Sequence, residues 1–190
     1  MKKMRRGDRE ITDFAEILEV LKKADTIRLG LNGAPYPYVV PLSFGFEALY
    51  GGAGGSVNGA GGANGSANGG ANDGGDEADE APRVAVYVHG ATEGLKHDLI
   101  ARDNHVCVEA DISHSFVRRD DEGGSSVTTS YESVIGFGSA KIVTGAEAEH
   151  GMALMLEHCG CPDFKYNKAD LDTVIIYKFT LTQITGKRNL

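Results

Sequence analysis

Long apolar runs are missing from this sequence, and so is the pattern of an export signal. No apolar stretch approaches the roughly 20 residues of a membrane-spanning helix. The basic residues 1–6 are not followed by the apolar core of a secretory signal peptide. Cysteine is also scarce, because Cys107, Cys159 and Cys161 are too few for a disulfide framework. These absences predict a cytoplasmic protein with reduced thiols and no membrane partner.

Basic residues are not in excess, and a zinc-type cluster of cysteine and histidine is also lacking. The chain has 19 Lys and Arg against 27 Asp and Glu, a formal net charge of −8. A nucleic-acid-binding protein needs a basic face, so we expect no nucleic-acid partner. The stretch His158-Cys-Gly-Cys161 matches no common zinc spacing and has no second ligand pair, so we expect no metal site.

Residues 51–82 have little apolar content and differ in composition from the rest of the chain. They hold 12 of the 26 glycines and five acidic residues, but no basic one. Such a segment cannot bury enough apolar surface to offset the entropy of ordering, which predicts a disordered insertion. Without its five acids the net charge changes from −8 to −3, so most of the acidity belongs to the insertion. We expect residues 1–190 to form one domain that this insertion interrupts.

Short apolar runs separated by turn signals predict about six mostly antiparallel strands with a few peripheral helices. Amphipathic spacing predicts helices at residues 13–24, 92–101 and 146–158. Strand patterns fall at residues 26–31, 37–46, 83–88, 105–111, 131–144 and 173–184. Gly136 and Gly138 predict a bulge or a close backbone approach in the fifth of these strands. This order favours a mainly β fold with α-helices (α+β), a small antiparallel barrel.

Three connections carry expectations of their own. The runs 26–31 and 37–46 should form a hairpin around Asn32-Gly33. A strand that begins at Leu49 should be interrupted by the insertion and resume at Arg83. The polar segments 116–130 and 185–188 are expected to be a mobile hairpin tip and a polar tail.

The segment Tyr87-Val-His-Gly-Ala-Thr-Glu-Gly-Leu-Lys96 has the pattern of an anion site. An apolar strand ends at His89-Gly90, and a helix is expected to begin at Thr92, a good N-cap, with Lys96 one turn later. The unpaired N–H groups of a helix start, a hydroxyl and a lysine together suit a phosphate. A capped helix with a solvated lysine is an equally good interpretation of this segment alone.

Six segments in this order resemble the flavin-nucleotide-binding proteins related to pyridoxamine 5′-phosphate oxidase, in the branch that includes the nitroimidazole-resistance (Nim) type. The resemblance covers nearly the whole chain except residues 51–82 and the loop around 118–128. The segments are Met4-Arg-Arg-Gly-Asp-Arg-Glu-Ile11, Arg28-Leu-Gly-Leu31, Tyr36-Pro-Tyr-Val-Val-Pro-Leu-Ser-Phe44, Tyr87 to Lys96 as above, Tyr131-Glu-Ser-Val-Ile-Gly-Phe-Gly138 and Ile184-Thr-Gly-Lys-Arg188.

The resemblance implies a split β-barrel homodimer that holds FMN between its two subunits. By position, Gly90, Ala91, Thr92 and Lys96 would hold the FMN phosphate, together with the amides up to residue 94. A strand would lie along the isoalloxazine ring, and two residues would come from the partner subunit to close the site. The strand residues are Val40, Pro41, Leu42 and Ser43, and the partner residues are Ser133 and Val134. Pro41 has no N–H, which fits a place beside a flat ring or in an edge strand.

His89 is the candidate catalytic residue. The resemblance places it near the flavin, where it would take part in the chemistry; the alternative is a corner histidine bonded to a nearby carbonyl. The leading hypothesis is an FMN-dependent oxidoreductase that takes electrons from NAD(P)H and reduces small acceptors such as nitroaromatics. Alternatives are a non-catalytic flavin-binding or redox-sensing protein, a relative that binds FAD, a deazaflavin or haem, and pyridoxamine phosphate oxidation, although the basic C-terminal signature of that enzyme is not clearly present.

Overall fold

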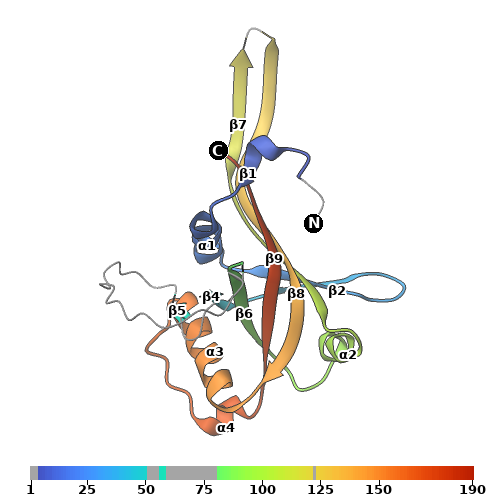
Figure 1. Cartoon of the computed structure of the whole chain (residues 1–190), viewed down its shortest axis with the longest axis vertical. Helices are drawn as coiled ribbons and strands as arrows, with labels where there is room; N and C mark the ends of the chain where they lie inside the picture. The colour runs from blue at the N-terminus through green and yellow to red at the C-terminus, as the bar shows by residue number, and fades with distance from the viewer. Residues whose placement is uncertain (1–3, 51–55, 59–80, 122) are drawn as a thin grey trace, which may run out of the picture.

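A computed structural model describes residues 4–50, 56–58, 81–121 and 123–190. The expected disorder of residues 51–82 lies largely outside these residues. In these residues strands predominate over helices, and the helices lie at the periphery (Figure 1). The strands are β1 (Glu10–Ile11), β2 (Ile27–Leu31), β3 (Tyr38–Leu42), β4 (Gly45–Leu49), β5 (Ser56–Asn58), β6 (Arg83–Gly90), β7 (His105–Asp121), β8 (Gly124–Val143) and β9 (Ile175–Asn189). The helices are η1 (Gly7–Arg9), α1 (Phe14–Lys23), α2 (Leu95–Arg102), α3 (Gly145–His158) and α4 (Lys168–Leu171).

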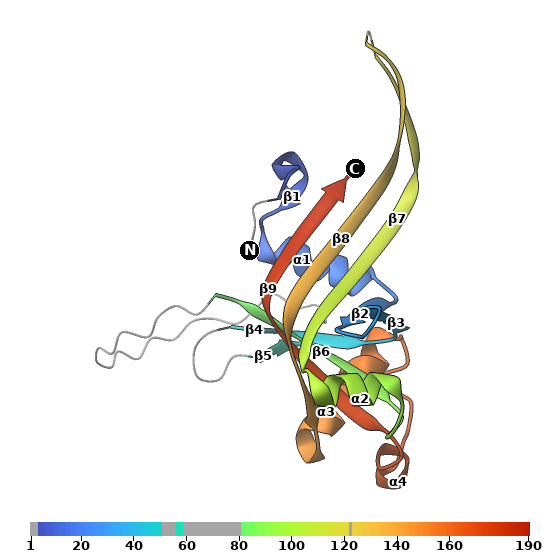
Figure 2. The same ribbon diagram turned by 90° about the vertical axis from the view of Figure 1, so that its right-hand side faces the viewer.

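The strands form one antiparallel sheet that does not close on itself. Its order is β3-β2-β7-β8-β9-β6-β4-β5, and β1 pairs with the far end of β9. Strongly curved β7, β8 and β9 run the length of the molecule, and β2 to β6 cross them lower down (Figures 1 and 2). The predicted α+β class with a split-barrel-like sheet is confirmed. The register of β8 against β9 shifts between Phe137 and Gly138, which confirms the predicted bulge.

Helices α1 and α3 form where local sequence predicts them. The Asp13 side chain accepts a hydrogen bond of 2.8 Å from the Ala15 N–H and caps α1, and Ile17, Val20 and Leu21 on one face of the helix are buried. Helix α3 begins one residue before the predicted start and ends at His158 as expected. Both helices pack on the sheet, so their apolar faces cover two separate parts of the core.

Strand β6 is buried on both faces and separates these two parts of the core. Val84, Val86 and Val88 face the larger cluster, which includes α1 and the barrel interior. Ala85 and Tyr87 face the smaller cluster under α3. An unbroken apolar run is the pattern of a strand covered on both sides. The two helices therefore lie on opposite faces of β6.

Several expected connections were wrong, because strand pairing depends on residues far apart in sequence. The run 37–46 is two strands, β3 and the start of β4. Strand β4 pairs antiparallel with β6, so residues 45–49 and 83–90 form a hairpin rather than one interrupted strand. Residues 56–58 of the insertion form β5 against β4.

The segment 116–130 forms the predicted hairpin tip, as paired strands, whereas residues 185–188 are part of a strand rather than a polar tail. Residues 116–121 pair with residues 124–129 and extend β7 and β8 into a two-stranded ribbon beyond the body (Figure 1). Both faces of such a ribbon meet solvent, so the sequence shows no apolar alternation there. Residues 185–188 pair with both β8 and β1, and this pairing orders a polar stretch.

A buried carboxylate ties α3 to the sheet. Glu47 on β4 is 3% exposed and accepts a hydrogen bond of 2.8 Å from the Tyr87 hydroxyl, while His150 Nε2 on α3 lies 2.9 Å from its other oxygen. Burial and the bond to Glu47 raise the pKa of Tyr87 far above its usual value. A buried carboxylate needs such donors to offset its lost hydration.

We expect Tyr87→Phe to lower the free energy of unfolding by about 1–3 kcal/mol, because a buried acceptor loses a donor. Urea denaturation measures this, and Tyr166→Phe is the matched control. The Tyr166 hydroxyl makes only a 3.4 Å contact to the Glu149 carbonyl, so its removal is expected to change stability by less than about 0.5 kcal/mol. Equal effects of the two substitutions would contradict a stabilising role for the Tyr87–Glu47 bond.

Candidate functional site

The end of β6 carries His89 and Gly90 out of the core. His89 pairs with Ile176 and Gly90 with Ile175 on β9, and the side chain of His89 is exposed. Among the bonds of the described residues its imidazole makes none, so the structure does not show the corner hydrogen bond that was the alternative for His89. The histidine ring is open to solvent directly after the most buried strand of the fold.

The expected helix start at Thr92 was wrong. Helix α2 begins at Leu95, and its N-cap is Gly94 with φ 115°. A backbone in this region suits glycine, so the chain turns at residue 94 and not at the threonine. Thr92 makes no capping bond; it lines a pocket of about 270 Å³ with Val143, Ile175 and neighbouring apolar residues.

The first turn of α2 leaves backbone donors open. The first N–H of the helix with a helical acceptor is that of Asp98, 3.1 Å from the Gly94 carbonyl. No side chain caps this end, and the described residues show no acceptor for the N–H groups of residues 95–97. A helix start with open backbone N–H groups is therefore present, three residues later than expected; its binding of an anion stays a prediction.

Lys96 folds back from this turn over the end of β6. Its Nζ donates a hydrogen bond of 3.3 Å to the His89 carbonyl and lies 5.6 Å from the centroid of the Tyr177 ring. Burial lowers the pKa of Lys96, and no ion pair with an acid holds it among the described residues. Gly90 makes room for it, since a Cβ there would lie 2.5 Å from Nζ. A half-buried cation without an acidic partner retains the capacity to pair with an anion.

Tyr177 was not among the residues predicted from the sequence. It lies on β9 opposite Val88, is fully buried, and its hydroxyl is 2.8 Å from His97 Nδ1 on α2. Burial, with a smaller effect of Asp98, raises the pKa of Tyr177. The Tyr177 ring makes a cation–π contact with Lys96, and its hydroxyl joins β9 to α2 through His97. Only the strand register brings these residues together, so no local pattern could have identified Tyr177.

The predicted strand 40–43 lies near this group. Val40 and Leu42 pack partly on the core, whereas Pro41 and Ser43 are exposed. Strand β3 ends the strand order and has β2 as its one neighbour among the described strands, so its outer edge is open. Gly45 pairs with Tyr87, which brings Ser43 toward the His89 end of β6.

The β2–β3 turn is also tied to α2. Arg102 Nη2 at the end of that helix donates to the Asn32 carbonyl at 2.6 Å, and Asn32 Nδ2 donates to Asp103 at 2.8 Å. The turn between β2 and β3 is therefore held at the C-terminal end of α2, and Ser43, after β3, leads to the strand beside the end of β6.

Ser133 and Val134 are not part of that region in the same chain. His89 and Val143 both pair with Ile176, and Ser133 lies ten residues before Val143 on β8. Ten residues of strand span roughly 33 Å. Ser133 points outward, while the side chain of Val134 is buried in the core, so only the backbone of Val134 is accessible.

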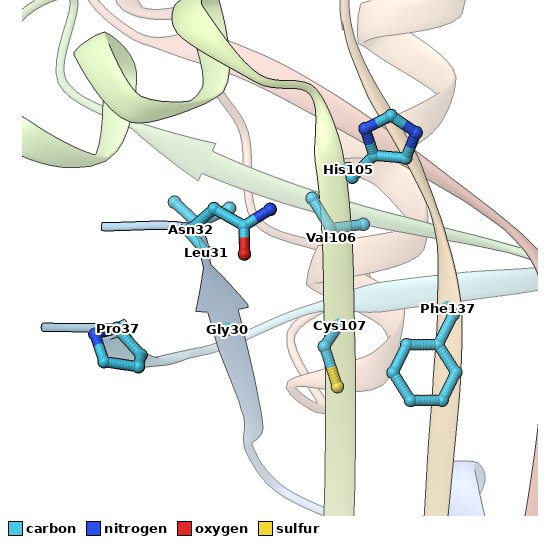
Figure 3. Close-up of a pocket in the computed structure, with 8 residues that line it drawn as sticks. All are labelled: Gly30, Leu31, Asn32, Pro37, His105, Val106, Cys107 and Phe137. Carbon is cyan, nitrogen blue, oxygen red and sulfur yellow. The ribbon is translucent and has the colours of Figure 1, made fainter. Parts of the chain in front are cut away.

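The outward face of β2, β7 and β8 is hollowed and apolar. A pocket of about 300 Å³ lies over Gly30, with Pro37, Cys107 and Phe137 around it (Figure 3). Cys107 and Phe137 pair across β7 and β8, and Figure 3 shows their side chains next to each other. Burial, with a smaller effect of Glu109, raises the pKa of the Cys107 thiol, which disfavours a reactive thiolate.

Neither a metal-binding cluster nor a membrane helix is found in the described part of the chain. No group of three or more His, Cys, Asp or Glu side chains there is arranged to hold a metal ion. Cys159 and Cys161 are exposed, and His158 Nε2 donates to the Ala24 carbonyl at 2.8 Å. No described helix is both long enough and apolar enough to cross a membrane.

Comparison with known proteins points to one family. The family model described as pyridoxamine 5′-phosphate oxidase matches residues 13–188. No curated protein matches the sequence. Among solved structures, a proposed 5-nitroimidazole antibiotic resistance protein from Bacteroides thetaiotaomicron is 23% identical with a TM-score of 0.67, over 94% of this chain and 85% of that one.

Two further structures share the fold at lower identity. The flavocytochrome Anf3 from Azotobacter vinelandii is 12% identical with a TM-score of 0.67, over 99% of this chain and 72% of that one. An FAD- and haem-binding protein from Mycobacterium smegmatis is 14% identical with a TM-score of 0.64, over 95% and 73%. These likenesses support the fold.

We expect Gly90→Ala to weaken phosphate binding at Lys96 with little loss of stability. The added Cβ displaces the flexible end of Lys96 rather than the backbone, so the fold is retained while the cation moves. Isothermal titration with inorganic pyrophosphate measures the affinity, and Gly7→Ala, where a Cβ meets nothing within 4 Å, is the control. Equal pyrophosphate affinity of the Gly90 variant and the unaltered protein would show that the anion binds elsewhere.

Proposed function

The chain belongs to the pyridoxamine 5′-phosphate oxidase family, and we propose that it is an FMN-dependent oxidoreductase that reduces small acceptors such as nitroaromatics. NADH or NADPH would supply the electrons, and two copies of the chain would hold the cofactor between them. Three free cysteines fit work in a reducing cytoplasm.

The observation that carries this proposal is the half-buried, unpaired Lys96 beside the open first turn of α2. A phosphate monoester is close to a dianion at neutral pH and requires a cation together with several donors. The cation is Lys96 Nζ, and the donors are the N–H groups of residues 95–97. Gly90, which has no side chain, leaves the space that the end of Lys96 occupies. When bound, the flavin supplies the electron transfer itself.

The open edge of β3 suits the ring of the same cofactor. Its unpaired main-chain groups are available to the polar edge of an isoalloxazine, and Pro41, without an N–H, leaves an apolar surface beside it. The short path from Ser43 to the His89 end of β6 keeps this edge close to the phosphate group.

His89 is the proposed proton donor to the acceptor. Its ring is exposed at the mouth of this region, while its carbonyl accepts the bond from Lys96. An imidazole is able to give a proton to a reduced acceptor and to regain it from water.

A second copy of the chain accounts for Ser133. In one chain this residue is roughly 33 Å along the sheet from His89, so it reaches the cofactor only from another subunit. The outward face that carries it also exposes Val39, Ile135 and Phe137 around the pocket over Gly30. Contiguous exposed apolar residues of this kind mark protein contacts.

The purified protein is expected to be yellow, with an FMN spectrum that bleaches when NADH or NADPH is added without oxygen. Lys96→Ala should weaken FMN binding by about 1.5–3 kcal/mol, the scale of a charge-assisted hydrogen bond. His89→Gln should retain FMN but lose about a hundredfold in kcat with a nitroaromatic, the lower range for general acid catalysis.

Extraction and mass measurement identify the cofactor, and Lys22→Ala, an exposed lysine on α1, is the control. A protein without flavin, or a flavin that no pyridine nucleotide reduces, would contradict the proposal. Tight FMN binding with slow turnover of every acceptor would instead indicate a flavin carrier or sensor.

We expect Phe137→Asp to convert a dimer to a monomer and to release flavin at the same time, because it places a charge in the proposed contact. Sedimentation velocity and flavin absorbance follow the two effects. Phe164→Asp, which alters an exposed phenylalanine beyond α3, should change neither. An unaltered protein that is monomeric and still binds FMN tightly would rule out the shared site.

A further inference from the structure

A second group of cations lies at the other end of β9. Tyr131 on β8, Lys187 on β9 and Arg9 at the end of η1 meet there. Lys187 Nζ lies 5.6 Å from the centroid of the Tyr131 ring. Burial alone would raise the pKa of Tyr131, but the nearby positive charges of Lys187 and Arg9 outweigh it and lower that pKa.

The two cations are held in place by backbone pairing. Glu10 pairs with Lys187 across β1 and β9, so Arg9 directly precedes a residue fixed to the sheet. Tyr131 pairs with Asn189, whose side chain donates to the Thr129 carbonyl at 2.6 Å. Lys187 and Tyr131 are therefore fixed in the sheet, and Arg9 lies directly before it.

The positive charge of this group is not neutralised within the described part of the chain. Neither Lys187 nor Arg9 forms an ion pair there, and Glu10, the acid nearest to Lys187 in register, makes none with it. The other acids nearby already have basic partners: Asp8 binds Arg6, Asp111 binds Arg28, and Glu132 lies near Lys23 and His114.

The group adjoins Ser133, the residue that the proposed function brings to the cofactor of a second copy. Ser133 and Lys187 are directly opposite each other on β8 and β9, so their side chains leave the same face. Tyr131 lies two residues before Ser133 and shares this face. A cofactor contacted by Ser133 thus has Tyr131 and Lys187 beside it.

We propose that Arg9, Lys187 and Tyr131 form a binding site for the anionic group, a carboxylate or a phosphate, of a small substrate of this protein. Two cations and a phenol hydroxyl provide charge-assisted donors to an oxyanion. The site rests on the proposed function for its role beside a flavin, but the charge and geometry exist without the cofactor. Two substrates could carry this anionic group: the electron acceptor, as a carboxylate, or NADPH, as its 2′-phosphate.

Two pairs of charged and uncharged substrates distinguish an acceptor carboxylate from the NADPH 2′-phosphate. In one arm, kcat/KM is compared for 4-nitrobenzoate and the neutral 4-nitrobenzyl alcohol. In the other arm, it is compared for NADPH and NADH with a fixed acceptor. Lys187→Gln and Arg9→Gln remove one charge each and keep a polar side chain, and Lys22→Gln on α1 is the matched control.

We expect each variant to lower the charged-to-neutral ratio of kcat/KM about tenfold in one arm, on the scale of one charge-assisted hydrogen bond. A fall with 4-nitrobenzoate assigns the site to the acceptor, and a fall with NADPH assigns it to the donor. Raised salt should reduce the same ratio in the unaltered protein, because exposed charges are screened. Ratios unchanged in both arms overturn the proposal.

A binding measurement keeps this test independent of turnover. Isothermal titration of the purified protein with 4-nitrobenzoate and with inorganic phosphate should show saturable binding that Lys187→Gln weakens about tenfold and Lys22→Gln does not. Flavin content is recorded on the same samples. Anion binding in a protein without flavin would defeat the proposed function alone, whereas a flavoprotein that binds neither anion would defeat the anion site alone.

Discussion

The burial of β6 on both faces is the constraint on which the rest of the fold depends. Val84, Val86 and Val88 pack into the barrel, and Ala85 and Tyr87 pack under α3. The strand is buried from Val84 to Val88, so its polar residues Arg83 and His89 lie at its two ends. A strand held on both sides cannot shift register without moving apolar side chains to water, which fixes the position of His89.

The position of Lys96 depends on the end of this buried strand. The same strand end supplies the carbonyl that accepts its hydrogen bond, and β9 supplies the Tyr177 ring beneath it. Burying a lysine without an acid partner costs free energy, and the lowered pKa reflects that cost. A bound anion would recover part of it. The positions of Gly90 and Gly94 allow the approach, one by lacking a side chain and the other by its backbone angle.

The length of β8 and β9 separates two groups of polar residues that one chain cannot join. Lys96 and His89 lie at one end, and Ser133, Tyr131 and Lys187 lie toward the other. Between them is an outward face with Phe137 and Ile135 exposed. An antiparallel sheet is stiff along its strands, so folding within one chain does not bring the two groups together. In the proposed dimer, association of two copies through that face would bring them together.

Much of the local structure was predictable from the sequence by itself. The Asp13 cap, the face of α1, the extent of α3 and the bulge at Gly138 follow from residues within a few positions of one another. The six-segment resemblance was also visible, and the family match agrees with it. The geometry of the turn before α2 was not predictable, because the helix begins after Gly94 and its unusual backbone angle, and not at Thr92.

Only the tertiary structure decided which distant residues meet. Tyr177 lies beneath Lys96 and bonds His97 through a register that joins residues 80 positions apart. The pairing of β4 with β6 and of residues 185–188 with β8 likewise depends on long-range hydrogen bonds that no short pattern encodes. Propensity and capping act over one or two turns of chain, whereas strand register and the burial of a charge are properties of the whole sheet.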